Sequence, residues 1–246
     1  MYLMNQQLFV TKRNGRREPL DLDKIHRVIS WAAEGLDNVS VSQVEIKSRI
    51  QFYDGIKTED IHETIIKAAA DLISEEAPDY QYLAARLAIF HLRKLAYGQF
   101  EPPHLYDQVT KMVEAGRYDR HLLEDYTREE FEQMNDFIDH SRDLNFSYAA
   151  VKQLEGKYLV QNRVTGEIYE SAQFLYVLVA ACLFANYSKE TRMDYVKRFY
   201  DATSLFKISL PTPIMAGVRT PTRQFSSCVL IETDDSLDSI NATASA

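Results

Sequence analysis

The sequence predicts a mainly α-helical protein with a small β hairpin near its start. The turn dipeptide Asn14-Gly15 indicates the hairpin, because it lies between the strand-like stretches 8–12 and 16–20. Helices are indicated from residue 21 to residue 206, where capping residues repeatedly precede apolar residues at helical spacing. A short apolar run at 228–231 follows a proline-rich segment and predicts one buried strand.

Four helices are expected after the hairpin, within the first hundred residues. Their starts are marked in order by Asp21 or Asp23, by the capping box Ser42-x-x-Glu45, by Thr58 and by Pro78-Asp79. The second helix is expected to bury Val44, Ile46 and Ile50. The third is expected to run from residue 59 to residue 74, and Gly98 is expected to end the fourth.

The middle of the chain is expected to form further helices. A second capping box, Thr127-x-x-Glu130, starts one of them. The run 171–187 is apolar nearly all round and is therefore expected to be buried against its partner, 191–206. This partner is expected to be amphipathic, with an apolar face made of Tyr195, Phe199 and Leu205. A Thr165-Gly166 turn indicates a second small hairpin between residues 159 and 169.

The segment from Leu210 to Ser227 combines prolines with many hydroxyl side chains. Proline lacks a backbone donor and restricts the residue before it, so this composition predicts an irregular loop and no helix. The loop would deliver the thiol of Cys228 to the first residue of the predicted strand, and enzymes often carry reactive groups on such loops. Cys228 could instead be a small core residue, which is the expectation for Cys182.

The charge and cysteine content exclude several classes of protein. The 36 acidic residues against 28 basic ones, a net charge of −8, argue against a non-specific DNA-binding surface. No apolar run reaches membrane-spanning length, and residues 1–7 lack the features of a signal peptide. The two cysteines stand in unrelated settings, as is usual in the reducing cytoplasm. The expectation is a cytoplasmic protein with no DNA partner and no membrane partner.

Three stretches near the start of the chain carry a family resemblance: Val10-Thr-Lys-Arg-Asn-Gly15, Asp21-Leu-Asp-Lys-Ile25 and Thr58-Glu-Asp-Ile-His62. They resemble the ATP cone, the nucleotide-sensing module at the front of many ribonucleotide reductases. In that family, ATP bound to the cone keeps the enzyme active and dATP turns it off. The resemblance implies phosphate contacts from Lys12 and Lys94. It further implies base and ribose contacts from Glu18, Pro19, Leu20, Asp21, Leu22, Asp23 and Lys24, and a pocket shared with Thr58, His62 and His91.

Each of these residues also has a purely structural interpretation. Lys12 and Lys94 could be solvated surface charges, and Asp21 and Thr58 could serve only as helix caps. The two histidines could be partly buried side chains with ordinary partners. The nucleotide-binding interpretation therefore depends on the whole set of residues and not on any one of them.

A second resemblance covers residues 211–228. The segment Pro211-Thr-Pro-Ile-Met-Ala-Gly217, followed by Arg219-Thr-Pro-Thr-Arg-Gln-Phe-Ser-Ser-Cys228, is similar to the segment that enters the ten-stranded α/β barrel of the large (alpha) subunit of class I ribonucleoside-diphosphate reductase. In that family a protein thiyl radical removes the ribose 3′ hydrogen and the 2′ hydroxyl leaves as water. A cysteine pair supplies two electrons and becomes a disulfide.

This resemblance implies an oxidoreductase that acts on CH or CH2 groups with a disulfide as acceptor, in deoxyribonucleotide synthesis for DNA replication. It implies that Cys228 is catalytic, as one member of the redox pair, and that this chain contains only this member. It also implies that Thr212 and Ser227, with Cys228, bind the ribonucleoside diphosphate substrate.

The stretch from Asp234 to Ile240 predicts a helix start capped by Asp235 or Ser236. A capped helix without any ligand would explain the pattern. The resemblance instead implies a specificity site, at which Asp235, Ser236 and Leu237 contact an effector nucleotide. This sequence departs from the family at 233–234, where Thr-Asp replaces the usual Cys-Gly and adds negative charge beside that site.

The resemblance also implies a domain organisation and a set of partners. Residues 1–98 would form the ATP cone, 99–220 a helical domain, and 221–246 the first strand and helix of the barrel. The cofactors implied are ATP or dATP with Mg as allosteric effectors. No metal would be bound directly by this chain, because the small (beta) subunit supplies the radical. The further partners implied are a second alpha subunit in a homodimer, and thioredoxin or glutaredoxin as reductant.

The sequence leaves three interpretations of this chain open. The remaining catalytic residues of the family are absent from this sequence, so the chain is expected to be an amino-terminal part that is inactive alone. It could also be a split-gene subunit that needs a complementary chain. A non-catalytic regulator built on the same cone is the third interpretation, but such regulators carry a four-cysteine zinc ribbon and a basic surface, and this chain has only two cysteines and an acidic balance.

Overall fold

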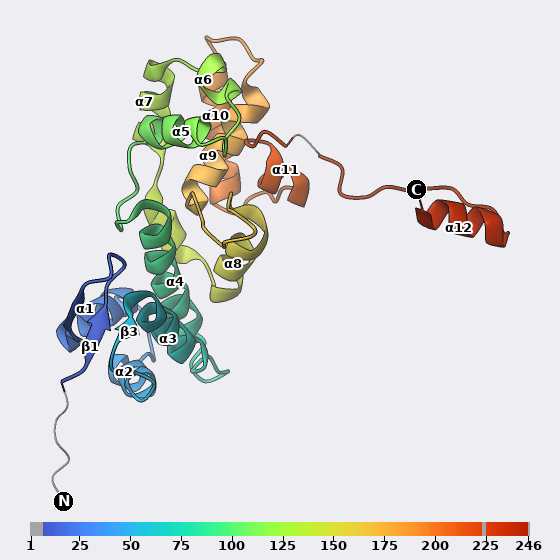
Figure 1. Cartoon of the computed structure of the whole chain (residues 1–246). Helices are drawn as coiled ribbons and strands as arrows, with labels where there is room; N and C mark the ends of the chain where they lie inside the picture. Colours follow the sequence, from blue (N-terminus) through green and yellow to red (C-terminus); the bar gives the residue numbers. More distant parts are fainter. Residues whose placement is uncertain (1–6, 223–224, 246) are drawn as a thin grey trace, which may run out of the picture.

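The computed structural model describes residues 7–222 and 225–245. It contains a small sheet at one end and helices over most of the remaining length, which confirms the predicted fold class of a mainly helical chain with a small hairpin (Figure 1). Strand β1 (Phe9–Thr11) pairs antiparallel with β2 (Arg17–Pro19), and Gly15 in the turn has the positive φ of 79° that such turns require.

The sheet has a third strand that the sequence does not predict. Strand β3 (Ile56–Lys57) runs parallel to β1, so the sheet order is β2-β1-β3. Val10 therefore lies opposite Glu18 on one side and opposite Ile56 on the other. Two residues are too few to show the alternation by which a strand is recognised in a sequence.

Four helices complete the first hundred residues: α1 (Leu22–Ala33), α2 (Val41–Arg49), α3 (Thr58–Ala70) and α4 (Tyr80–Tyr97). Asp21 caps α1 as expected, because its carboxylate accepts hydrogen bonds from the backbone N–H groups of Asp23 (3.0 Å) and Lys24 (3.2 Å). Gly98 ends α4 as expected, with the left-handed φ of 74° that closes many helices.

The prediction for α2 was wrong in two respects. Ser40 caps the helix, because its hydroxyl accepts from the backbone of Gln43, so the box beginning at Ser42 is not the cap. Val44 is buried, but Ile46 is 64% exposed. Residues two positions apart on a helix face opposite sides, so Val44 and Ile46 cannot share the buried face. Ile50, six positions from Val44, is likewise 80% exposed.

The bounds of α3 also differ from the prediction. Thr58 is the first helical residue and not the cap, and no side chain caps the helix from position 57. The helix ends at Ala70, four residues before the expected Ser74. Helix ends are set by a few hydrogen bonds and are the least certain part of any prediction.

Helix α4 joins the first hundred residues to the remainder of the fold. It packs against α3 and α1 on one side, and against 3₁₀ helix η1 (His140–Asn145) and α8 (Tyr148–Gln153) on another. The guanidinium of Arg86 donates to the carbonyl groups of Ala32 (3.1 Å) and Leu144 (3.3 Å), and thus ties the end of α1 to η1. Arg93 is buried and pairs with the buried Asp143 at 2.8 Å.

The remaining helices are α5 (Leu105–Glu114), α6 (His121–Asp125), α7 (Arg128–Phe137), the π-helical turn η2 (Leu154–Tyr158), α9 (Ala172–Phe184), α10 (Arg192–Ser204), α11 (Thr212–Gly217) and α12 (Leu237–Ser245). Helix α9 forms the centre of this part, because every residue from 172 to 181 is buried. This confirms the predicted burial for residues 171–181, but not for the end of the predicted run 171–187, where Leu183 and Tyr187 are 39% and 47% exposed. The second small hairpin, predicted between residues 159 and 169, is present in reduced form. Gln161 and Ile168 form an isolated antiparallel bridge, and the backbone N–H groups of Tyr169 and Asn162 donate to the carbonyl groups of Val160 (3.0 Å) and Glu167 (2.8 Å). Gly166 in the turn has a positive φ of 75°.

Helix α10 packs against α9 as predicted, and the rings of Tyr195 and Phe199 lie 5.6 and 5.4 Å from the ring of Phe184 at the end of α9. Val196 and Tyr200 are buried, whereas Tyr195 and Leu205 are 38% and 46% exposed. The residues four positions apart, 196 and 200, share a side of the helix. The prediction named Tyr195 and Phe199, which border this face, but it missed the buried pair. Leu205 lies just beyond the end of the helix and does not belong to the buried face.

Helix α11 contradicts the expectation that the proline-rich segment contains no helix. Pro211 precedes the helix and Pro213 lies in its first turn. In that position a missing N–H group costs nothing, because the first amides of a helix have no partner within the helix. The prolines thus start a short helix at Thr212 where they were expected to prevent one.

The buried strand predicted at 228–231 is not formed. The described residues of this segment are extended and exposed, with Val229 at 76% and Leu230 at 98%. A barrel strand is held by hydrogen bonds to neighbouring strands, and the described chain offers none at this position. Residues 223–224 of the predicted loop and the final residue 246 lie outside the described residues. Within 7–222 and 225–245, no helix combines the length and the apolar character needed to cross a membrane.

The capping box of α7 gives a test of these local assignments. Thr127 accepts from the backbone of Glu130, and the Glu130 carboxylate accepts in return from the backbone of Thr127 at 2.8 Å. Thr127→Ala is expected to lower the free energy of unfolding by about 1 kcal/mol, measured by urea denaturation. Thr191→Ala is the matched control, since Thr191 stands at the start of α10 without a capping bond. Equal effects of the two variants would contradict the capping role.

Candidate nucleotide-binding site

A cavity of about 660 Å³ lies between the β1–β2 hairpin and the helices α1, α3 and α4. Nine of the twelve residues predicted for the nucleotide-control site line it: Lys12, Glu18, Pro19, Leu20, Asp21, Lys24, Thr58, His62 and Lys94. They come from four separate elements, so the fold alone brings them together. This size is within the range typical of small-molecule sites.

Three of the predicted residues do not line this cavity. Leu22 and Asp23 border an adjoining open depression formed by residues 16–24. His91 is buried behind His62, and the two rings stack with centroids 5.4 Å apart. His91 therefore supports a wall of the cavity without facing into it.

Basic residues outnumber acidic residues in the lining of the cavity. Its basic residues are Lys12, Arg13, Lys24, Arg27 and Lys94, against the two acids Glu18 and Asp21. The Lys12 ammonium lies 3.6 Å from the Glu18 carboxylate, which also accepts from the Arg16 guanidinium. The hydrogen bond from Arg16 holds the pKa of Glu18 below its usual value. The surplus of positive charge favours a polyanionic ligand.

The amino-terminal end of α3 adds to this positive potential. Thr58, the first residue of the helix, lines the cavity, and no side chain caps the helix there. The N–H groups at a helix start carry partial positive charge and commonly bind phosphate. Arg13 is fixed beside this end, because it pairs with Glu59 at 3.1 Å and donates to the Lys94 carbonyl at 2.6 Å.

An aromatic cluster forms the apolar wall of the cavity. The ring of Phe90 lies 5.9 Å from Trp31 and 5.5 Å from His62, measured between centroids. The Lys94 ammonium stands 5.4 Å from the centroid of Phe90. A flat apolar wall beside cations suits a nucleotide, which combines a base with phosphates.

Sequence reasoning missed Arg13, Trp31 and Phe90 as residues of this site. Phe90 could have been found from its spacing, because it precedes Lys94 by four residues and so shares one side of α4. Arg13 follows Lys12 in the hairpin, but its direction depends on the long-range pair with Glu59. Trp31 reaches the cavity from α1, and nothing in the local sequence signals this.

The two stacked histidines are neutral at physiological pH. Burial is the main cause that lowers the pKa of His62 to about 4, and the neighbouring His91 and Arg13 add to the effect. Burial likewise lowers the pKa of His91 to about 4. Neutral imidazole rings can stack on a base and hydrogen-bond without adding charge.

The residues predicted for substrate binding are not assembled in the described chain. Thr212 is exposed at the start of α11, and Ser227 and Cys228 are exposed in the extended segment beyond it. The Ser227 hydroxyl lies 3.8 Å from the Cys228 sulfur, and no hydrogen bond of the described residues joins Thr212 to either of them. Cys182, expected in the core, is half-buried in α9.

The residues predicted for the specificity site lie at the start of α12, which stands apart from the body of the molecule (Figure 1). The Ser236 hydroxyl accepts from the backbone of Ser239 at 3.2 Å, so Ser236 and not Asp235 caps the helix. Leu237 is 78% exposed. Within residues 7–222 and 225–245, no cluster of three or more His, Cys, Asp or Glu side chains is arranged to hold a metal.

The buried histidines predict that acid destabilises the fold. The unfolded chain binds a proton on each ring near pH 6.5, whereas His62 and His91 bind one only near pH 4 when folded. The unfolded state holds more protons between these values, so the free energy of unfolding falls as pH drops from 6.5 to 4. The loss is on the order of 3 kcal/mol for each ring.

Urea denaturation across this pH range measures the effect. His62→Gln removes one titrating ring and is expected to make stability depend less steeply on pH. The matched control is His121→Gln on α6, whose ring is exposed and pairs with Glu124. Burial also lowers the pKa of His140 to about 4. This ring is present in all variants and therefore contributes equally to the pH dependence of their stability. If His62→Gln left the slope of the unfolding free energy against pH unchanged, the buried, neutral state assigned to His62 would be contradicted.

Comparison with known proteins agrees with the arrangement of the fold. The ATP cone domain matches residues 8–95, and the all-alpha domain of ribonucleotide reductase matches residues 144–223. The chain is 82% identical over 243 residues, 99% of its length, to ribonucleoside-diphosphate reductase 1 subunit alpha of Escherichia coli (strain K12). It is 79% identical over 99% of its length to the subunit alpha of Haemophilus influenzae, and 49% identical over 96% to that of Enterobacteria phage T4.

These matches cover 32%, 32% and 31% of the respective relatives, so the chain spans about a third of the length of the curated relatives it matches. Along the chain, the match to the ATP cone domain precedes the match to the all-alpha domain. By sequence, the chain contains the ATP cone domain and the all-alpha domain of ribonucleotide reductase, and it matches ribonucleoside-diphosphate reductase alpha subunits over 99% of its own length.

Proposed function

We propose that this chain provides the nucleotide-control region of a ribonucleoside-diphosphate reductase. The whole enzyme would reduce ribonucleoside diphosphates to deoxyribonucleotides by radical chemistry. The observation that carries the proposal is the cationic cavity with one aromatic wall, formed by residues of the ATP cone domain. The alternative function, a DNA-binding regulator built on the same cone, receives no support, because the chain has a net charge of −8 and DNA binding favours a basic surface.

ATP and dATP are the proposed ligands of the cavity. Lys12 and Lys94 would contact the phosphates, together with the amides at Thr58, while Mg bound to the nucleotide would offset part of the phosphate charge. The base would lie against the wall formed by Trp31 and Phe90, near the neutral His62. Glu18 to Lys24 would then close over the ribose from the hairpin side. In this proposal ATP keeps the enzyme active and dATP turns it off.

The catalytic contribution of this chain would come from Cys228. As the ribose loses its 2′ hydroxyl as water, Cys228 and a second thiol would supply two electrons and two protons and become a disulfide. Thioredoxin or glutaredoxin would reduce that disulfide again. Thr212 and Ser227 would hydrogen-bond the substrate, and the exposure of Cys228 agrees with a thiol that must exchange with partners.

Other partners follow from the same proposal. Asp235, Ser236 and Leu237 would bind an effector that selects the substrate, and α12 would take part in contact with a second alpha subunit. The small beta subunit would supply the radical. The second thiol and the radical-bearing cysteine are not among this chain's residues, since Cys182 lies in α9 within the helical part. We therefore expect no turnover by this chain alone, and activity only together with the remainder of the subunit.

Calorimetry with ATP and dATP tests the nucleotide site. Lys94→Ala is expected to weaken binding of both nucleotides roughly 10- to 100-fold, because one charge-assisted hydrogen bond of about 1.5–3 kcal/mol is lost. Lys67→Ala, an exposed lysine of α3 outside the cavity, is the matched control and should bind normally. If Lys94→Ala bound both nucleotides with unchanged affinity, the proposed contact of Lys94 with the phosphates would be wrong. If the wild-type chain bound neither nucleotide, the proposed site itself would be wrong.

The redox role of Cys228 is tested in the subunit completed by the remaining two thirds of the relatives' length, with the small subunit present. Cys228→Ser is expected to abolish multiple turnover of CDP with a dithiol reductant, because serine cannot form the disulfide. Cys182→Ser, the other cysteine of this chain, should retain turnover. Normal rates in Cys228→Ser would mean that its thiol has no part in the reaction.

A further inference from the structure

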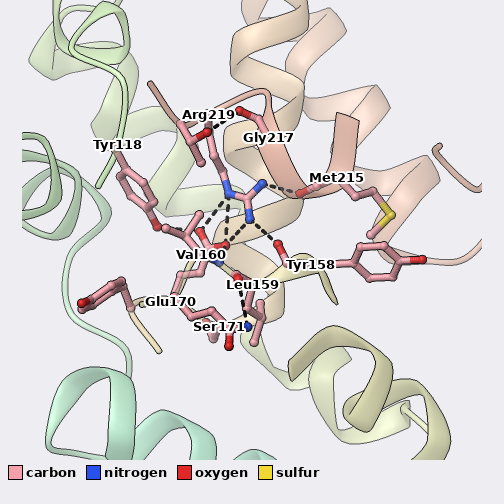
Figure 2. A network of polar contacts seen from close by, with 12 residues as sticks. Tyr118, Tyr158, Leu159, Val160, Glu170, Ser171, Met215, Gly217 and Arg219 are labelled. Carbon is pink, nitrogen blue, oxygen red and sulfur yellow. Dashed lines mark hydrogen bonds and ion pairs between the residues drawn. The ribbon is translucent and has the colours of Figure 1, made fainter. Parts of the chain in front are cut away.

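Arg219 and Glu170 form an ion pair deep inside the helical part. Both side chains are fully buried, and the Arg219 Nε donates to the two carboxylate oxygens of Glu170 at 3.1 and 2.9 Å. Figure 2 shows the guanidinium and the carboxylate facing each other between segments from distant parts of the sequence. Two buried charges are costly to desolvate, so such a pair persists only where its geometry is well satisfied.

The carboxylate of Glu170 is held from two further sides. The Tyr118 hydroxyl donates to Oε2 at 2.6 Å, and the backbone N–H of Val160 donates to Oε1 at 2.8 Å (Figure 2). Burial raises the pKa of Tyr118 well above its ordinary value, so the hydroxyl remains a donor. Two bonds that do not involve Arg219 thus hold the carboxylate of Glu170 in position.

The other donors of Arg219 bind main-chain carbonyl groups. One terminal nitrogen donates to Met215 of α11 and the other to Tyr158 of η2 at 2.9 Å (Figure 2). The carbonyl of Arg219 itself accepts from the backbone of Asp119 at 2.9 Å. The side chain of Arg219 therefore joins α11, η2 and the start of α9, and its backbone carbonyl adds the turn before α6.

This clamp stands between the residues proposed to meet the substrate. Thr212 lies seven positions before Arg219, on the helix whose Met215 carbonyl the guanidinium holds. Cys228 lies nine positions after it, and Arg219 is the last buried residue that the structure describes before that thiol. Residues 221, 222 and 225–238 are all exposed. The direction in which the chain leaves the helical part is therefore set at Arg219.

We propose that Arg219, held by Glu170 and Tyr118, is a positioning residue for the segment that carries Cys228. The planar guanidinium forms forked bonds in fixed directions, which a lysine ammonium cannot reproduce. It therefore fixes both α11 and the exit of the Cys228 segment relative to α9. This inference rests on the proposed function, because it concerns the placement of the thiol against a substrate.

Arg219→Lys tests the proposal in the subunit completed by the remainder of its length, with the small subunit present. The variant keeps the charge and loses the fork, so kcat for CDP reduction is expected to fall at least tenfold. The KM for CDP is expected to change less than threefold, and ATP binding at the cone should not change. Tyr118→Phe, which removes one bond to Glu170 and keeps the ion pair, should lower kcat by a smaller factor if Arg219→Lys fails to fold.

Arg192→Lys is the matched control. Arg192 is also buried and pairs with a carboxylate, Glu130, in the same part of the fold, but it lies far along the chain from Cys228. It should lose thermal stability to a similar extent as Arg219→Lys and keep a normal kcat. Equal kcat values for the two variants, or a normal kcat in both Arg219→Lys and Tyr118→Phe, would overturn the positioning role. Normal turnover in Cys228→Ser would instead overturn the proposed function itself.

Discussion

The structure depends on α4, a single helix that serves two parts of the fold. Phe90 and Lys94 face the nucleotide cavity from this helix. Arg93 is bound to the buried Asp143 of the helical part, and the Tyr97 hydroxyl donates to the Ser171 hydroxyl at 3.0 Å while accepting from its N–H. Because these bonds are buried and closely packed, a displacement of α4 at the cavity would strain them. The proposed nucleotide site is therefore joined through α4 to the helices around α9.

Local chemistry explains which elements were predictable. The Asn14-Gly15 turn, the Asp21 cap, the Thr127 box and the stop at Gly98 all depend on residues close in sequence, and each was confirmed. The predictions that were wrong concern features that depend on residues close in space but distant in sequence. Strand β3 exists because β1 offers it an edge, and Ile46 is exposed because α2 packs through its other side. The prolines of α11 were misjudged because their position within the first turn matters more than their number.

In the candidate site, too, some residues could be predicted from local sequence and others depend on contacts in space. Nine of the twelve residues named from the family motifs line the cavity, but Arg13 and Phe90 became visible only when the hairpin and α4 were brought together. The residues predicted for substrate and effector binding stay apart, since Cys228 and α12 lie in a segment without packed neighbours in the described chain. Their roles depend on partners in space that local sequence cannot provide, and they remain proposals.

The shared helix has a consequence for anyone who wishes to use the cone as a portable nucleotide biosensor. A module cut after Gly98 would retain the whole cavity lining, but it would strip Arg86, Arg93 and Tyr97 of their partners in η1 and at Ser171. The severed surface would present unpaired charges and apolar side chains to water. A graft would therefore need either to carry the α9 region along or to redesign that side of α4 with solvent-compatible residues.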